Sequence, residues 1–162
     1  MKIVCISQVY WPDTASVAQH LVDLLQTLSD HGHDVTVITS RHNYEHPEII
    51  YPAVEYCNGV RIYRIFNTGF GKRTKLGRLA DFLSFNVLIM CRLLALRRSA
   101  CDVMLGLTSP PLLSYIGIKI ARMKKIRFVY WTMDLQPELS MVAGYIKTDA
   151  TPAKVMQKCG DY

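Results

Sequence analysis

The sequence predicts an α/β fold, a Rossmann-like doubly wound parallel sheet in a single domain. Short apolar, β-branched stretches alternate with longer stretches of helical periodicity along the 162 residues, which is the pattern of repeated βαβ units. A chain of this length suits one domain. Half of its residues are hydrophobic, so it can bury a core without a disulfide or metal. The usual chain path of such units predicts the strand order 3-2-1-4-5.

The first βαβ unit has the clearest signals. Residues 2–7 and 34–40 are short apolar runs rich in β-branched side chains, as strands of a parallel sheet are. Between them, apolar residues recur every three or four positions from Val17 to Leu28, which predicts an amphipathic helix. Gly32 favours the end of that helix. Such a crossover makes the two strands parallel.

The rest of the chain continues the alternation of apolar and polar stretches. Residues 41–58 have no clear period, and we expect a long loop there, which at that length is usually functional or mobile. The remaining predicted elements are, in order, a strand at 59–66, a loop at 67–77, a very apolar helix at 78–98, a strand at 101–107, a helix at 112–123, a strand from 126, and short helices at 137–145 and 151–159.

Three loops are predicted to meet at one edge of the sheet, since ligands of open parallel sheets bind beyond the carboxyl ends of the strands. These loops are residues 8–16, 107–111 and 132–138. Asp134 follows the last predicted strand and is the candidate catalytic residue, and Glu138 is a candidate for binding substrate. The alternative is that both acids only stabilise the start of the next helix.

Hydroxyl groups are the other candidate ligands at this edge. Thr14 and Ser16 precede the first predicted helix, and Thr108 and Ser109 precede a later one. Together with backbone N–H groups at a helix N-terminus, they could bind a phosphate or a sugar hydroxyl. The alternative is ordinary helix capping, by Asp13 as well as by Thr14 or Ser16. The residues alone leave both readings open.

Several kinds of chemistry have no support in the sequence. The loop 8–16 contains no glycine, so neither a dinucleotide fingerprint nor a P-loop is present. The five histidines have no metal-ligand spacing and are read as solvated loop residues. The five cysteines contain no CxxC pair and are expected to be reduced. We therefore expect no metal and no cofactor.

The net charge of +6 favours an anionic partner. Four basic residues next to the apolar helix at 78–98 are predicted to contact an anionic membrane surface; the alternative is a solvated basic loop. They are Lys72, Arg73, Lys75 and Arg78. No nucleic-acid-binding motif is present. Without a secretory signal or a span, we expect a cytoplasmic protein, peripheral on the inner face of the plasma membrane.

Five stretches, taken together, resemble a known family. The chain is similar to the N-terminal domain of GT-B glycosyltransferases of family 4, close to the WbuB-like group. The residues that carry the resemblance are 2–8 with 12–15, then 32–40, 59–64, 108–113 and 130–138. Each stretch is weak alone, and the order and spacing make the resemblance specific.

The resemblance implies two Rossmann-like domains that face a cleft, with retention of anomeric configuration and no metal. Residues 1–162 would then be the acceptor-side domain, without the C-terminal donor-binding domain, and inactive alone. It would bind a nucleotide-sugar donor only with a second domain. Its acceptor would be a saccharide or lipid-linked saccharide in lipopolysaccharide or other cell-surface polysaccharide synthesis. Its exposed domain interface would favour self-association.

The chain departs from the family pattern at two places, and a third feature is missing. Thr14-Ala15-Ser16 replaces glycines in the first loop, and Met133 stands where a histidine often precedes the aspartate. Asp134 is then the best remaining polar group for the cleft. The donor-site E-x7-E motif does not occur in this sequence. Two alternatives are a non-catalytic remnant or partner module, and half of a GT-B sugar-nucleotide epimerase.

Overall fold

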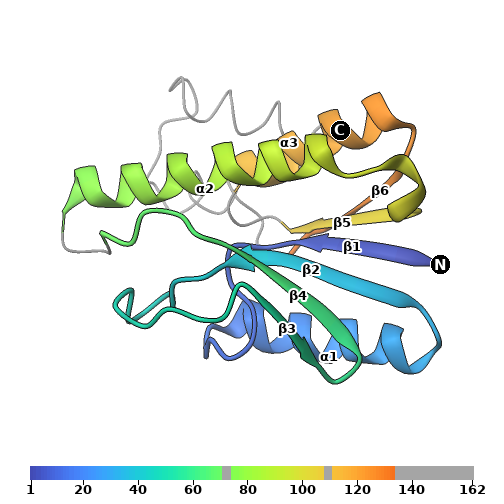
Figure 1. Cartoon of the computed structure of the whole chain (residues 1–162), viewed down its shortest axis with the longest axis horizontal. Helices are drawn as coiled ribbons and strands as arrows, with labels where there is room; N and C mark the ends of the chain where they lie inside the picture. Colours follow the sequence, from blue (N-terminus) through green and yellow to red (C-terminus); the bar gives the residue numbers. More distant parts are fainter. Residues whose placement is uncertain (71–73, 108–110, 134–162) are drawn as a thin grey trace, which may run out of the picture.

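A single six-stranded sheet organises the part of the chain that the computed structural model describes, residues 1–70, 74–107 and 111–133. The strand order is β3-β4-β2-β1-β5-β6 (Figure 1). All neighbouring strands are parallel except β3, which pairs antiparallel with β4. The strands are β1 (Lys2–Ile6), β2 (Asp34–Ser40), β3 (Val54–Cys57), β4 (Val60–Ile65), β5 (Val103–Leu107) and β6 (Arg127–Trp131).

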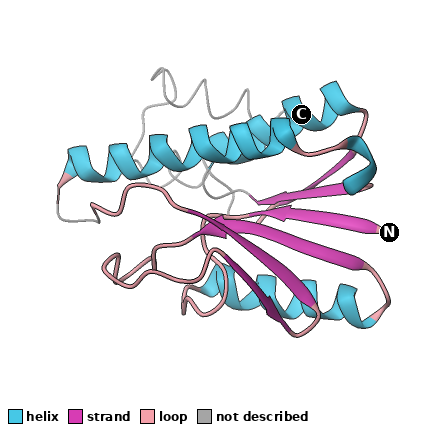
Figure 2. Cartoon of the chain, viewed as in Figure 1, coloured by secondary structure: helices cyan, strands magenta, loops and turns pink. Residues whose placement is uncertain are grey.

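Helices cover both faces of this sheet. Helix α1 (Ser16–Asp30) lies on one face, and α2 (Lys75–Ala95) and α3 (Pro111–Lys124) lie side by side on the other (Figure 2). A short 3-10 helix, η1 (Arg98–Ala100), follows α2. None of the helices within the described residues has the length and apolar character needed to cross a membrane.

Two hydrophobic cores result from the alternation of side chains along the strands. In β1, Val4 and Ile6 belong to the core under α2 and α3, whereas Cys5 between them belongs to the core under α1. The first core is completed by Phe85, Ile89, Leu93, Met104 and Leu113, among others. The second is completed by Leu21, Leu25, Val35, Val37 and Ile62, among others. The central strands β1, β2 and β5 are therefore mostly buried on both faces, whereas the edge strands β3 and β6 keep exposed side chains.

The sheet differs from the expected parallel sheet of order 3-2-1-4-5 in having a sixth strand, which is antiparallel and makes the sheet mixed. The additional strand β3 comes from the stretch 41–58, which was expected to be a loop. Asn58 and Gly59 both have positive φ, of 47° and 76°, and they join β3 to β4 directly after the pair Cys57↔Val60. Two residues with positive φ make a tight hairpin whose twist matches the strands. The five strands that were expected lie in the order β4-β2-β1-β5-β6.

The boundaries of two helices also differ from the sequence prediction. Helix α2 begins at Lys75 rather than 78, since Thr74 accepts a hydrogen bond from the Gly77 N–H at 3.0 Å and caps it. It ends at Ala95 rather than 98. Helix α3 extends the expected helix by one residue at each end. The helices expected at 137–145 and 151–159 lie outside the described residues.

Two glycines allow α3 to approach the sheet closely beside Phe128 of β6. A Cβ atom on Gly117 of α3 would lie 2.8 Å from Cε2 of Phe128 and 2.7 Å from Cδ1 of Ile6. A Cβ atom on Gly106 of β5 would lie 2.6 Å from Cζ of the same ring. The ring therefore fills the space that both glycines leave open, and this contact sets the distance between α3 and the sheet.

We predict that Gly117→Ala destabilises the protein, although alanine favours a helix over glycine by about 1 kcal/mol. Overpacking a core contact costs about 1–3 kcal/mol, so we expect a net loss measurable by urea unfolding. The double variant Gly117→Ala/Phe128→Leu should be more stable than the sum of the two single changes implies, because leucine removes the clashing ring atoms. A Gly117→Ala protein as stable as the wild type would contradict this packing.

Candidate functional site

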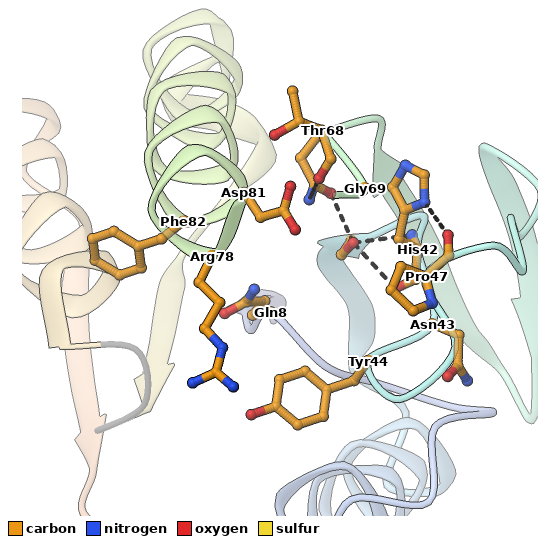
Figure 3. A pocket seen from close by; sticks show the side chains of 12 residues that line it. Gln8, His42, Asn43, Tyr44, Pro47, Thr68, Gly69, Arg78, Asp81 and Phe82 are labelled. Carbon is orange, nitrogen blue, oxygen red and sulfur yellow. Dashed lines mark hydrogen bonds between the residues drawn. The ribbon is translucent and has the colours of Figure 1, made fainter. Parts of the chain in front are cut away.

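A pocket of about 430 Å³ lies at the carboxyl edge of the sheet, next to the first turns of α2 (Figure 3). Gln8 follows β1, Ser40 ends β2, and Asn67 follows β4, so three strand ends contribute to its lining. Arg78 and Asp81 come from α2. The remaining lining residues are His42, Asn43, Tyr44 and Pro47 from the loop after β2, Thr68 and Gly69 after β4, and Phe82 of α2.

The side of the pocket between β2 and β4 is built from buried polar groups. Ser40 Oγ donates to Asn67 Oδ1 at 2.7 Å, and Asn67 Nδ2 donates to the Thr68 carbonyl at 2.9 Å. Ser40 Oγ also accepts from the His42 N–H at 3.0 Å. Both Ser40 and Asn67 are buried. Because each contact fixes the next, the loops after the two strands are held in one arrangement.

His42 is packed into this wall rather than solvated, which corrects the sequence interpretation. Its ring lies 5.1 Å from the Phe66 ring, and a Cβ atom on Gly69 would come within 2.5 Å of its Cε1. Nδ1 is 2.7 Å from the Pro47 carbonyl; because a carbonyl only accepts, Nδ1 carries the proton. Nε2 is buried and has no hydrogen-bond partner within the described part of the chain.

The first turns of α2 form the opposite wall. Asp81 Oδ1 accepts from the Phe70 N–H at 3.0 Å, and Ser84 Oγ accepts from the Thr68 N–H at 3.1 Å. These bonds attach the loop after β4 to the helix. In Figure 3 the side chains of Asp81, Arg78 and Tyr44 surround the same open space. Arg78, which was predicted to contact a membrane, thus lines the pocket.

A buried arginine supports the loops behind the pocket. The Arg64 guanidinium donates to Glu55 Oε2 at 2.5 Å and to the Trp11 carbonyl at 2.8 Å, and it lies 5.0 Å from the centre of the Tyr51 ring. Its side chain is only 1% exposed, against 29% for that of Glu55. One residue of β4 therefore joins the loop after β1 to both ends of the segment 51–55.

Asp13 connects this support to the pocket. Its Oδ1 accepts from the Tyr44 N–H at 3.1 Å, so it positions a lining residue. Burial raises the pKa of the Asp13 carboxyl, and this outweighs the hydrogen bonds from Tyr44 and Tyr10 and the charge of Arg64, which lower it. Asp13 does not cap α1: the N-cap residue is Ala15, and no side chain caps that position.

The residues predicted from the sequence are only partly at this pocket. Thr14 and Ser16 are exposed at the start of α1 and are not among the residues that line it. Six of the predicted residues lie outside the described residues: Lys72, Arg73, Thr108, Ser109, Asp134 and Glu138. Lys75 is the first residue of α2. The loops 41–47 and 67–69 were missed as site components. The signal was present, since Asn67 directly follows a predicted strand and His42 comes two residues after another.

The lining combines groups that suit a hydroxylated ligand. Amides, a hydroxyl and a carboxylate donate and accept hydrogen bonds, and Tyr44 and Phe82 offer apolar ring faces. Arg78 can bind an anionic oxygen through two parallel hydrogen bonds. Among the described residues, no group of three or more histidine, cysteine, aspartate or glutamate side chains is arranged to hold a metal ion.

Comparison with known proteins does not assign a family to this chain. No model of a protein family matches it, and no curated protein matches it. The chemistry of the pocket therefore carries the functional argument.

We predict that Arg64→Ala destabilises the protein by about 3 kcal/mol, because it leaves Glu55 and the Trp11 carbonyl without their partner. The matched control is Arg61→Ala on the same strand. Arg61 donates to the Tyr56 hydroxyl at 2.6 Å at the surface, where such a contact contributes less than about 1 kcal/mol. Urea unfolding of the two variants measures both values. Equal losses would contradict the supporting role of Arg64.

The raised pKa of Asp13 predicts a pH-dependent difference between the wild type and Asp13→Asn. The pKa of the Asp13 carboxyl is higher in the folded protein than in the unfolded chain, where it is about 3.9. Protonation of Asp13 therefore stabilises the folded protein at pH values below about 3.9, and this contribution is lost as the pH rises through the folded pKa. Asparagine keeps the acceptor for Tyr44 but does not ionise. The wild type should therefore lose stability relative to Asp13→Asn as the pH rises from about 3.5 to 7. A relative gain over that range, in unfolding curves, would contradict the burial of Asp13.

Proposed function

We propose that this chain is the acceptor-binding half of a retaining GT-B glycosyltransferase of family 4. The whole enzyme would transfer a sugar from a nucleotide-sugar to a saccharide or lipid-linked acceptor in cell-surface polysaccharide synthesis. The observation that carries the proposal is the polar pocket at the carboxyl edge of a largely parallel α/β sheet. This is the edge at which sheets of this class bind ligands.

The pocket favours an acceptor over a nucleotide. Gln8, after β1, and Asp81, on α2, offer an amide and a carboxylate, which suit hydroxyls of a sugar ring. The loop after β1 contains no glycine, so it lacks the close backbone approach that a pyrophosphate site needs. Arg78 at the rim suits a phosphate between the sugar and a lipid carrier. The proposal therefore assigns the donor to a second domain that faces this edge.

The catalytic carboxylate of the proposal is Asp134. It follows the stretch 130–133 that carries part of the family resemblance, and it comes three residues after the end of β6. In a parallel sheet the carboxyl end of β6 belongs to the same edge as that of β1. Within the proposal, Asp134 acts at the transferring centre, and the pocket residues hold the acceptor.

The proposal predicts saccharide binding by this chain alone. Monosaccharides such as N-acetylglucosamine, galactose and mannose, titrated into the ¹⁵N-labelled chain, should shift the backbone amide signals of Gln8, residues 40–44 and residues 67–69. UDP-N-acetylglucosamine should add no shifts beyond those of its sugar. Asp81→Asn should weaken binding about tenfold, because a hydrogen bond to a charged group contributes about 1.5–3 kcal/mol. Gln8→Ala should weaken it less, and the matched control Gln26→Ala on α1 should not.

Three results would decide against the proposal. Absence of any saccharide-dependent shift would remove the acceptor site. Tighter binding of the nucleotide-sugar than of free sugars would favour the half-epimerase. If the chain binds saccharides and a supplied donor-binding domain yields transfer that Asp134→Asn leaves unchanged, Asp134 has no catalytic role.

A further inference from the structure

Gln8 is a lining residue whose backbone is held in place while its side chain has no partner. Its carbonyl accepts from the Ser40 N–H at 3.3 Å and from the Thr39 hydroxyl at 3.1 Å. On its other side, the fully buried Ser7 donates its hydroxyl to the Val9 carbonyl at 2.8 Å, which fixes the turn around Gln8. Within the described part of the chain, the Gln8 side-chain amide makes no hydrogen bond.

The hydroxyl and amide side chains of the neighbouring strand ends are used by the wall itself. The Ser40 hydroxyl and Asn67 Oδ1 bond to each other at 2.7 Å, and the Thr68 hydroxyl shares a hydrogen bond of 2.9 Å with a serine of α2. Asn43 Oδ1 accepts two backbone N–H groups of its own loop, at 2.9 and 2.7 Å. Gln8 differs from these residues, since both ends of its amide remain available to a ligand.

Gln8 also lies where ligands of this fold class bind. It follows β1, and β1 lies between β2 and β5 in the sheet. The chain leaves β1 through α1 on one face and reaches β5 through α2 on the other (Figure 2). The helices therefore diverge beyond the carboxyl end of β1, and such a reversal point forms the binding crevice of an open α/β sheet. Figure 3 shows the Gln8 side chain among the lining residues, between Arg78 and the loop after β2.

We propose that Gln8 determines which acceptor sugar the pocket takes, by binding two hydroxyl groups on adjacent ring carbons. An amide offers a donor and an acceptor side by side, as glutamine does when it binds the edge of adenine. Two neighbouring hydroxyls match this pair, because one accepts from Nε2 and the other donates to Oε1. Since each hydroxyl can do either, both orientations of the amide give two hydrogen bonds. The inference rests on the proposed function and names the part of the sugar that is recognised.

Gln8 and Asp81 have different roles in this arrangement. An ionised carboxylate such as that of Asp81 only accepts, so one hydroxyl satisfies it. The Gln8 amide is satisfied only by an acceptor and a donor together, and removal of either hydroxyl leaves one of its groups unpaired. Asp81 therefore contributes affinity for sugars in general, and Gln8 contributes the preference among them.

Saccharide titrations of the whole ¹⁵N-labelled chain test the inference. The ligands are the methyl glycosides of glucose, galactose and mannose and the monodeoxy derivatives of each. For the glycoside that binds best, two derivatives that lack hydroxyls on adjacent carbons should bind about fivefold more weakly than the parent. The side-chain NH₂ signals of Gln8, assigned by their loss in Gln8→Met, should shift most with the parent and less with either of these two derivatives.

The variant Gln8→Met separates recognition from a structural role, because methionine keeps the length of glutamine without its polar groups. It should bind the parent glycoside about fivefold more weakly than the wild type does, and the same two derivatives as well as it binds the parent. The matched control is Gln26→Met on α1, which should keep the wild-type order of affinities. Backbone amide signals outside the pocket that match those of the wild type show that both variants are folded.

Three outcomes would overturn the inference. A Gln8→Met protein that still binds the two derivatives more weakly than the parent would assign the preference to other residues. Loss of affinity only for derivatives that lack hydroxyls on separated carbons would exclude a paired contact. Equal shifts of the Gln8 NH₂ signals with the parent and all derivatives would exclude contact with the missing hydroxyls. If no saccharide shifts any signal, the proposed acceptor site itself fails, so the two failures can be told apart.

Discussion

The buried guanidinium of Arg64 is the constraint on which the carboxyl edge of the sheet depends. An arginine side chain that is 1% exposed is stable only when its donors are satisfied and its charge is paired. Arg64 achieves this with the Glu55 carboxylate, the Trp11 carbonyl and the Tyr51 ring. These partners come from β3, the loop after β1 and the segment before β3. The hydrogen bonds and ring contact of the Arg64 guanidinium thus bring three separate segments together. The Arg64–Glu55 ion pair also holds the edge strand β3 against β4, in addition to their backbone hydrogen bonds.

Asp13 and Tyr44 connect the segments held by Arg64 to the pocket. A second set of contacts completes the pocket wall. Gly69 leaves the space that the His42 ring occupies, and Ser40 and Asn67 close the gap between the ends of β2 and β4. The result is a preformed concave site with buried polar groups, where hydrogen bonds to a ligand lose little to rearrangement. Under the proposed function, this lining would hold an acceptor sugar through several of its hydroxyl groups.

Helix α2 connects the pocket to the outer surface of the helical layer. Its first turns supply Arg78 and Asp81 to the pocket, while large apolar side chains of the same helix, from Leu76 to Leu94, are exposed. A helix that packs on a sheet normally exposes charged residues on its outer face. The sequence of α2 is therefore more apolar than its packing against the sheet requires.

The sequence by itself determined the α/β class, five of the six described strands and the three described α-helices, because apolar periodicity reports directly which face of an element is buried. It did not determine β3, since Val54–Cys57 lacks the apolar alternation of the other strands and the Asn58-Gly59 turn was not recognised as a hairpin signal. The hydroxyls at the carboxyl edge were candidates by position, yet Thr14 and Ser16 do not line the pocket. Only the tertiary structure decided that His42, Asn67 and Asp81 meet there, because their proximity comes from the lateral order of the strands and the path of α2. Periodicity along a chain carries no information about distances between segments, and those distances follow from how the two cores are packed.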